Sequence, residues 1–300
     1  MTDSTLGRTL IERLPQRLQH YISLTRFDRP IGTFLLLWPT LTALWIAADG
    51  WPGWHLFLVF SIGTLLTRSA GCILNDLADM RFDGEVKRTK DRALVTGKVD
   101  PMEAMFVAAA ILFCALLLVL TTNLQTVLLS VVAVVITAIY PLMKRYTYLP
   151  QAVLGVAFSM GILMAFTAAQ ESIPNIAWLL LIANLLWVVA YDTQYAMVDR
   201  DDDLRLGIKS TAILFADLDR VMLGILQAAF LLVMFLLPRS MELSVWFYLG
   251  LAGALGLFVY QGYLTWDRDR EGCFDAFLNN HWVGLSVFFG TFVHYYLISS

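Results

Sequence analysis

Two aspartate-rich stretches interrupt long apolar segments of this sequence. Carboxylates are costly beside a bilayer unless something binds them. At 3.6 residues per turn, the acidic positions of each stretch fall on one helix face. Hard divalent cations take oxygen ligands, and Mg²⁺ commonly bridges carboxylates to a substrate phosphate, so two such faces opposed across a cavity predict a diphosphate site. The aligned side chains are Asn75, Asp79 and Asp83 in the first stretch, and Asp192, Asp199 and Asp203 in the second.

Either stretch alone could instead be a solvated cap of a membrane helix, since acidic helix ends are common. Two stretches with similar spacing favour a shared cause, and we therefore interpret them together as one site.

Composition determines the class of protein. The chain has 300 residues, of which 58% are hydrophobic and 15% are charged, and its mean hydropathy is +0.67. These values are too apolar for a soluble domain and indicate an all-α polytopic membrane protein. The net charge of −3 gives no sign of a nucleic-acid partner.

Apolar windows of about 20 residues, the length that crosses a bilayer, predict nine transmembrane helices. We expect one membrane-embedded domain over residues 1–300, with a basic, polar N-terminal segment at 1–30. Asn279 and Asn280, inside the last span, are expected to hydrogen-bond to each other or to a neighbouring helix. The predicted spans are 31–49, 55–77, 102–121, 124–142, 150–169, 174–198, 219–237, 243–265 and 277–298.

The charges of the connecting segments predict the orientation. All but two of the 21 Lys and Arg residues fall in segments on one side of this arrangement; the exceptions are Arg68, inside the second span, and Arg239. By the positive-inside rule, the basic side is cytoplasmic. Both aspartate-rich stretches, and hence the active site, should therefore face the cytoplasm, and an odd number of spans places the C-terminus outside.

Several basic residues lie near the carboxylates. Arg68 is on the same helix face as Asn75, about 10 Å deeper at 1.5 Å per residue, and a buried cation needs an anionic partner. Tyr140 and Lys144 are one turn apart, and Arg145 offers a guanidinium fork suited to carboxylate or phosphate. These charges could simply set the topology, as could the other candidates for diphosphate contact. Those candidates are Lys87, Arg88 and Lys209.

At these residues the chain resembles the UbiA superfamily of intramembrane prenyltransferases. The resemblance covers essentially the whole chain and extends to the branch that prenylates 4-hydroxybenzoate in ubiquinone biosynthesis. Where that branch usually reads Arg-Pro-Leu after the first motif, this chain has Ala93, which should slightly loosen the loop. The family's motif NDxxDxxxD is matched by Asn75, Asp76, Asp79 and Asp83, DxxxD by Asp199 and Asp203, and YxxxK by Tyr140 and Lys144.

The resemblance implies nine helices around a central cavity in the bacterial inner membrane, with Mg²⁺, a polyprenyl diphosphate and 4-hydroxybenzoate as ligands and membrane lipid around the tail. Arg145 would anchor the acceptor carboxylate, with Arg68 as the second candidate. The metal ligands implied are Asp79, Asp83, Asp199 and Asp203, of which the first three are also catalytic with Arg145. Substrate contacts are implied for Asn75, Arg68, Lys87, Arg88, Tyr140, Lys144, Asp192 and Lys209.

Two other functions remain open at this point. A relative within the family could prenylate another aromatic acceptor. A divalent-cation transporter could also hold carboxylates within the membrane, but a cation path should avoid Lys and Arg around its ligands, whereas a diphosphate site requires them. The basic residues beside both aspartate stretches therefore favour the prenyltransferase.

Overall fold

A computed structural model describes residues 13–237 and 243–298 of the chain. Every element within the described residues is a helix. Arg8 and Arg239, which entered the charge comparison above, lie outside these ranges. The elements are α2 (Gln16–Thr25), α3 (Ile31–Ala47), α4 (Gly53–Asp83), α5 (Pro101–Val119), α6 (Leu124–Tyr146), α7 (Pro150–Gln170), α8 (Asn175–Leu206), α9 (Thr211–Phe215), η1 (Ala216–Leu218), α10 (Asp219–Leu236), α12 (Val245–Leu264) and α13 (Arg270–Ile298).

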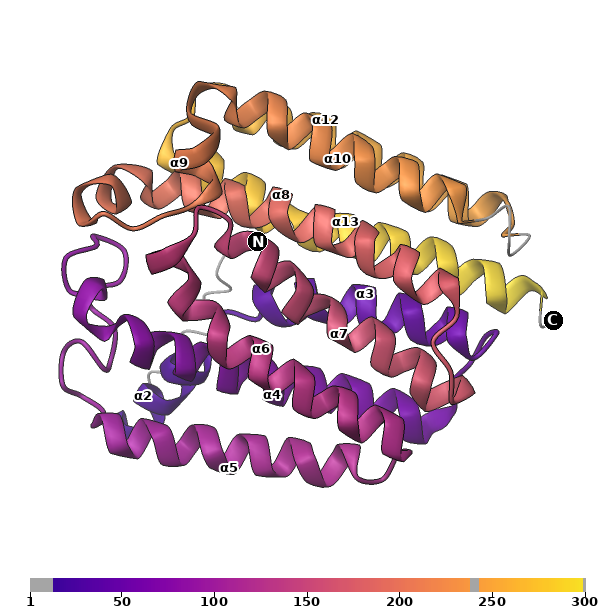
Figure 1. Ribbon diagram of the computed structural model, residues 1–300, viewed down its shortest axis with the longest axis horizontal. Helices are drawn as coiled ribbons and strands as arrows, with labels where there is room; N and C mark the ends of the chain where they lie inside the picture. Colours follow the sequence, from indigo (N-terminus) through magenta and orange to yellow (C-terminus); the bar gives the residue numbers. More distant parts are fainter. Residues whose placement is uncertain (1–12, 238–242, 299–300) are drawn as a thin grey trace.

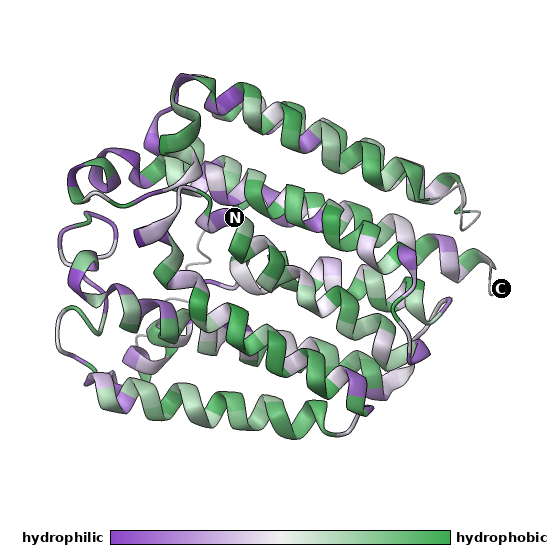
Figure 2. Cartoon of the chain, in the orientation of Figure 1, coloured by the Kyte–Doolittle hydropathy of each residue, from purple (hydrophilic) through white to green (hydrophobic). Residues whose placement is uncertain are grey.

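The long helices lie side by side, and the segments around α2 and α9 gather at one end of the bundle (Figure 1). Helix α13 packs against α12, α3 and α8, while α7 packs against α8, α6 and α3. The hydrophilic residues concentrate at the same end as α2 and α9, and apolar residues cover the helix bodies (Figure 2). The bundle therefore has one polar end, and that end carries both aspartate stretches.

The prediction of an all-helical membrane protein is confirmed, but the number of nine spans is not. Seven described helices, α4 to α8, the α9–α10 segment and α12, are long and apolar enough to cross a membrane. The other two predicted spans correspond to α3, which has 17 residues, and α13, which has 29. Helix α13 contains Asn279, Asn280 and His281, and these polar groups lower its hydropathy.

Local chemistry fixes several helix ends. The side chain of Asp100 accepts a hydrogen bond from the Met102 backbone N–H, with Pro101 at the first helical position of α5, an arrangement that satisfies an otherwise unpaired donor. Asn123 caps α6 in the same way. Helix α8 is followed by Gly207, whose φ of 69° suits glycine.

Exposed apolar side chains cover the outer faces of several helices. Exposed hydrophobic side chains such as Phe106 and Phe113 project from α5, and Leu124 and Leu128 project from α6. Within the bundle, α12 and α13 approach closely at Gly250 and Gly290: a Cβ on Gly250 would lie 2.6 Å from the Ser286 carbonyl oxygen. Small residues at helix contacts are typical of membrane bundles.

Candidate active site

The two aspartate stretches occupy the final turns of two long helices. Helix α4 continues to Asp83 and α8 to Leu206, each several residues beyond the predicted spans. The helical spacing assumed from the sequence therefore holds through both motifs. The polar end also contains the end of α6, with Lys144, and the turn-rich segment 84–100.

Lys144 connects the first motif to α6. Its Nζ donates a hydrogen bond to Asp79 Oδ2, and Asp79 is 2% exposed. The other carboxylate oxygen, Oδ1, is buried and accepts no hydrogen bond from any described residue. Tyr140, one turn before Lys144, interacts electrostatically with Asp79 and Asp192. The YxxxK motif thus brings both aspartate stretches together.

Arg88 makes the matching contact at the second motif. Its Nε lies 3.1 Å from Asp199 Oδ2, and its guanidinium lies over the Tyr195 ring, 4.6 Å from the centroid. Burial alone would lower the pKa of Arg88, but the Tyr195 hydroxyl and the Asp199 carboxylate outweigh it and raise that pKa. A guanidinium in this position keeps its positive charge at the site.

Shared cations join the two motifs into one electrostatic unit. Asp203 interacts with Asp199, Lys144 and Arg88. Asp192, deeper in α8, interacts with the same Lys144 and Arg88. Carboxylates and cations therefore alternate across the space between α4, α6 and α8, which is the arrangement expected for binding a polyanion together with a metal.

Asp76 has a role that the sequence did not reveal. It accepts two hydrogen bonds from Arg26 Nη2, at 2.7 and 2.9 Å, and lies 2.9 Å from Arg92 Nη1. The same Arg92 nitrogen lies 2.5 Å from Asp83 Oδ2. Arg92 follows the motif by nine residues and Arg26 precedes Asp76 by 50, and sequence spacing gave no sign of which carboxylate each would meet. Together they tie α2 and the segment 84–100 to the end of α4.

Three predicted basic residues reach other partners. Arg145 donates to the Ala78 carbonyl oxygen at 2.7 Å and lies over the Phe82 ring. Lys209 donates to the Tyr146 carbonyl oxygen at 3.2 Å. Lys87 is exposed, and its charge acts on Asp202. They line the border of the site and do not contact the motif carboxylates.

Arg68 and Asn75 lie deeper on α4. The Arg68 guanidinium packs against Gly32, where a Cβ would come within 2.2 Å of its Nε, so α3 leaves room for this cation by having glycine there. Arg68 interacts electrostatically with Arg26, Tyr195 and Asp76. Asn75 is half-buried on the same helix.

The residues of the site fit Mg²⁺ by donor type. All four predicted ligands offer carboxylate oxygens, and Asp79 Oδ1 has a free acceptor site. Within the described residues, no group of three or more His, Cys, Asp or Glu side chains is placed to hold one ion. Three of the four predicted ligands pair instead with Lys144, Arg88 and Arg92. The predicted metal ligands thus remain a prediction.

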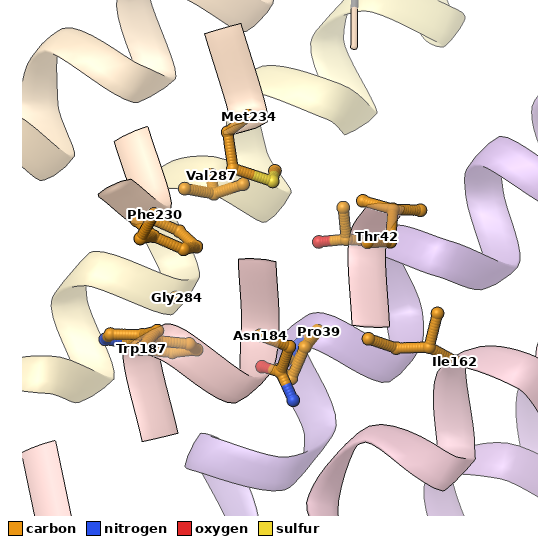
Figure 3. Close-up of a pocket in the computed structure, with 10 residues that line it drawn as sticks. Pro39, Thr42, Ile162, Asn184, Trp187, Phe230, Met234, Gly284 and Val287 are labelled. Carbon is orange, nitrogen blue, oxygen red and sulfur yellow. The ribbon is translucent and has the colours of Figure 1, made fainter. Parts of the chain in front are cut away.

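An apolar pocket lies deeper in the bundle than the charged end, and Figure 3 shows its lining residues. Its volume is about 30 Å³, and Trp187 and Asn184, from α8, form part of its wall. Trp187 precedes Asp192 by five residues, roughly 7 Å along a helix axis. The other lining residues are Pro39, Thr42, Ile162, Leu180, Phe230, Met234, Gly284 and Val287.

Comparison with solved structures confirms the fold. The chain resembles the apo structure of a UbiA homologue from Aeropyrum pernix K1, with a TM-score of 0.77 at 22% identity, covering 87% of this chain and 97% of that one. A UbiA homologue from Archaeoglobus fulgidus bound to GPP and Mg²⁺ gives a TM-score of 0.66 at 15% identity, covering 91% and 99%. At these identities, the likeness concerns the fold.

Sequence comparison shows the family. A chain from Pseudomonas aeruginosa (strain UCBPP-PA14), named 4-hydroxybenzoate octaprenyltransferase, is 54% identical over 287 residues, covering 96% of this chain and 97% of the relative. One of the same name from Chromohalobacter salexigens is 56% identical over 274 residues, covering 91% and 92%. The model of the UbiA prenyltransferase family matches residues 36–289. The chain therefore belongs to the UbiA prenyltransferase family.

Proposed function

We propose that this protein transfers a polyprenyl group from polyprenyl diphosphate to 4-hydroxybenzoate. The group joins the ring carbon ortho to the hydroxyl, and diphosphate is released, as a step of ubiquinone biosynthesis. The relatives named above, with more than half of their residues identical over nearly the whole chain, support this reaction. The observation that carries it in the structure is the alternation of carboxylates and cations, Asp79 with Lys144 and Asp199 with Arg88.

The diphosphate lies between α4, α6 and α8 in this proposal. Lys144 and Arg88 neutralise its charge, and Lys87 and Lys209 add positive charge at the border. Mg²⁺, held by Asp79, Asp83, Asp199 and Asp203, supplies further charge neutralisation and makes diphosphate a better leaving group. Lys144 and Arg88 can turn from a carboxylate to a phosphate oxygen without leaving the site, because both side chains are flexible and each already lies between the two motifs.

The chemistry needs a defined place for the acceptor. Loss of diphosphate leaves an allylic cation, and the electron-rich ring attacks it through the carbon ortho to the hydroxyl; loss of the ring proton then restores aromaticity. Arg145 anchors the acceptor carboxylate, with Arg68 as the alternative. Arg145 already donates to the carbonyl oxygen of Ala78, next to Asp79, so its guanidinium contacts the backbone of the first motif.

The position of the apolar pocket suits the prenyl tail. The pocket is deeper in the bundle than the charged end, and its wall is formed mainly by apolar side chains. A long polyprenyl chain is insoluble in water, so its remaining units continue between helices into membrane lipid. The positive-inside distribution supports an inner-membrane protein whose site opens to the cytoplasm.

The proposal is tested with purified protein, radiolabelled 4-hydroxybenzoate and a polyprenyl diphosphate, with and without Mg²⁺. We expect a Mg²⁺-dependent prenylated product, and loss of that product in Asp79→Ala and Asp199→Ala. Asp91→Ala is the matched control, because Asp91 is an exposed carboxylate of the segment 84–100.

Three outcomes would contradict the proposal. Product formed equally well without divalent cation would exclude the metal role. Prenylation of a naphthoate but not of 4-hydroxybenzoate would identify another acceptor. Absence of any product, with Mg²⁺ flux in proteoliposomes, would identify the transporter instead.

A further inference from the structure

A chain of buried side-chain amides crosses the bundle beside the apolar pocket. Gln194 Nε2 and Gln227 Nε2 each donate to Gln261 Oε1 at 3.0 Å, and Gln261 Nε2 donates to Asn279 Oδ1 at 3.1 Å. Asn280 Nδ2 donates to Gln194 Oε1 at 2.8 Å. Helices α8, α10, α12 and α13 each contribute, so Asn279 and Asn280 bond to neighbouring helices, as the sequence predicted.

One end of this chain is an aromatic ring of the pocket wall. The indole Nε1 of Trp187 donates to Asn280 Oδ1 at 2.9 Å. Trp187 and Asn280 are 2% and 1% exposed. In Figure 3, the Trp187 nitrogen points away from Asn184, and the ring lies between that nitrogen and the pocket. The amide of Asn280 therefore holds the ring from behind.

Other contacts fix the same ring from its remaining sides. Tyr191 packs edge-on against it with centroids 5.4 Å apart, and Phe230 lies at 5.8 Å. Gly284, one helical turn after Asn280, approaches so closely that a Cβ would meet Trp187 Cη2 at 2.8 Å. Helix α13 thus supplies both the hydrogen bond and the space that the indole needs.

If the indole N–H of Trp187 lost its acceptor on Asn280, the side chain of Asn184 in the pocket wall could accept it instead. Asn184 Oδ1 is buried, lines the pocket and accepts no hydrogen bond from the described residues. A buried indole N–H without an acceptor is unfavourable, so removal of the Asn280 amide would favour rotation of the ring toward Asn184. That rotation would occupy pocket volume.

We propose that Asn280 is a positioning residue that sets the preference for donor tail length by holding Trp187 against the pocket wall. This inference rests on the proposed function and on the tail entering the pocket. With a volume of only about 30 Å³, the pocket is far narrower than typical ligand sites, so an intruding indole would close it and penalise a long tail more than a short one.

The test compares kcat/KM for a long donor, octaprenyl diphosphate, with that for a short one, geranyl diphosphate. We expect Asn280→Ala to lower the long-to-short ratio by about tenfold, a typical discrimination for an apolar pocket, mainly through KM of the long donor. Gln227→Ala is the matched control: it removes another buried amide of the same network that makes no contact with Trp187, and its ratio should stay within about twofold of wild type.

Two further variants show whether Asn280 acts through the indole. Trp187→Phe removes the N–H group, and the double variant Asn280→Ala/Trp187→Phe should show no larger change than Trp187→Phe alone, because coupled residues are non-additive. Should Asn280→Ala fail to fold, Trp187→Phe still tests the ring: an unchanged ratio refutes the inference.

The possible failures are distinguishable. Equal losses with both donors in Asn280→Ala and Gln227→Ala would show that the network serves stability alone and would overturn the inference. In that case, the proposed function would still stand as long as the wild-type protein prenylates 4-hydroxybenzoate with either donor. Wild-type protein inactive with both donors would instead contradict the proposed function.

Discussion

Lys144 on α6 donates a hydrogen bond to Asp79 on α4, so the YxxxK motif and the first aspartate motif meet in space. Replacement of Lys144 by Met leaves a buried carboxylate without its cation and removes one positive charge from the proposed diphosphate site. We expect kcat/KM to fall at least about 30-fold, which corresponds to ~2 kcal/mol. Initial rates with labelled 4-hydroxybenzoate measure this.

Lys144→Arg should recover part of the lost activity, because it keeps the charge with altered geometry. Lys98→Ala, at an exposed lysine of the neighbouring segment, serves as the control. Equal effects of Lys98→Ala and Lys144→Met would show that general positive charge, and not this contact, matters.

Asp203 interacts with the cations that also serve Asp79 and Asp199, and it is a proposed metal ligand. Asp203→Asn should raise the Mg²⁺ concentration for half-maximal activity by about tenfold, the scale seen when the surroundings of a metal site are altered. A Mg²⁺ activation curve checks this. Asp201→Asn, at a carboxylate that is 71% exposed, should leave the Mg²⁺ concentration for half-maximal activity unchanged. An equal increase in both variants would indicate a general charge effect.

Arg88 combines a bond to Asp199 with stacking on Tyr195. Lysine keeps the charge but cannot reproduce the planar fork or the stacking. Arg88→Lys should therefore lower kcat/KM by about tenfold or more, as steady-state kinetics with varied donor would show. Full activity in Arg88→Lys would mean that a point charge suffices. Lys90→Arg, at an exposed neighbour, is the reciprocal control.

Asp76 holds Arg26 and Arg92 and should matter for stability. Asp76→Asn keeps the side-chain volume and removes the charge that both guanidinium groups meet. We expect unfolding free energy to fall by about 3 kcal/mol, the low end for breaking a buried pair, since these groups keep 16–18% exposure. Denaturation of the detergent-solubilised protein gives the value. An equal loss in Asp91→Asn, at an exposed site, would contradict this assignment.

Glycine should matter at Gly250 and not at Gly256 of the same helix. A Cβ at Gly250 would clash with α13, whereas nothing lies within 4 Å of one at Gly256. We expect Gly250→Ala to cost about 1–3 kcal/mol and Gly256→Ala to be neutral or to stabilise by about 0.5 kcal/mol. Thermal unfolding of the two variants measures this difference. Equal unfolding midpoints would show that the close contact between α12 and α13 does not require glycine at position 250.

Residue types and spacing were sufficient to predict the helical membrane fold, and the motifs were sufficient to predict the family; the site residues stay a prediction. Helical periodicity is local, so the aspartates of each motif share a face wherever the helix continues, and α4 and α8 continue through both motifs. Hydropathy is also a local property, which is why seven of the predicted spans match helices that are long and apolar enough to cross a membrane. It does not decide whether α3 and α13 cross the membrane, because α3 is short and the polar amides of α13 are satisfied by neighbouring helices.

Partner choice between distant segments was decided by tertiary packing. Nothing in the spacing of Arg26, Arg92 and Asp76 shows that they meet, since the two contacts join residues 50 and 16 positions apart. The sequence likewise marked Asn280 as polar in an apolar helix, but the acceptor it offers Trp187 exists because α8 and α13 pack side by side. Local spacing determines which groups share a face; the packing of whole helices determines which faces meet.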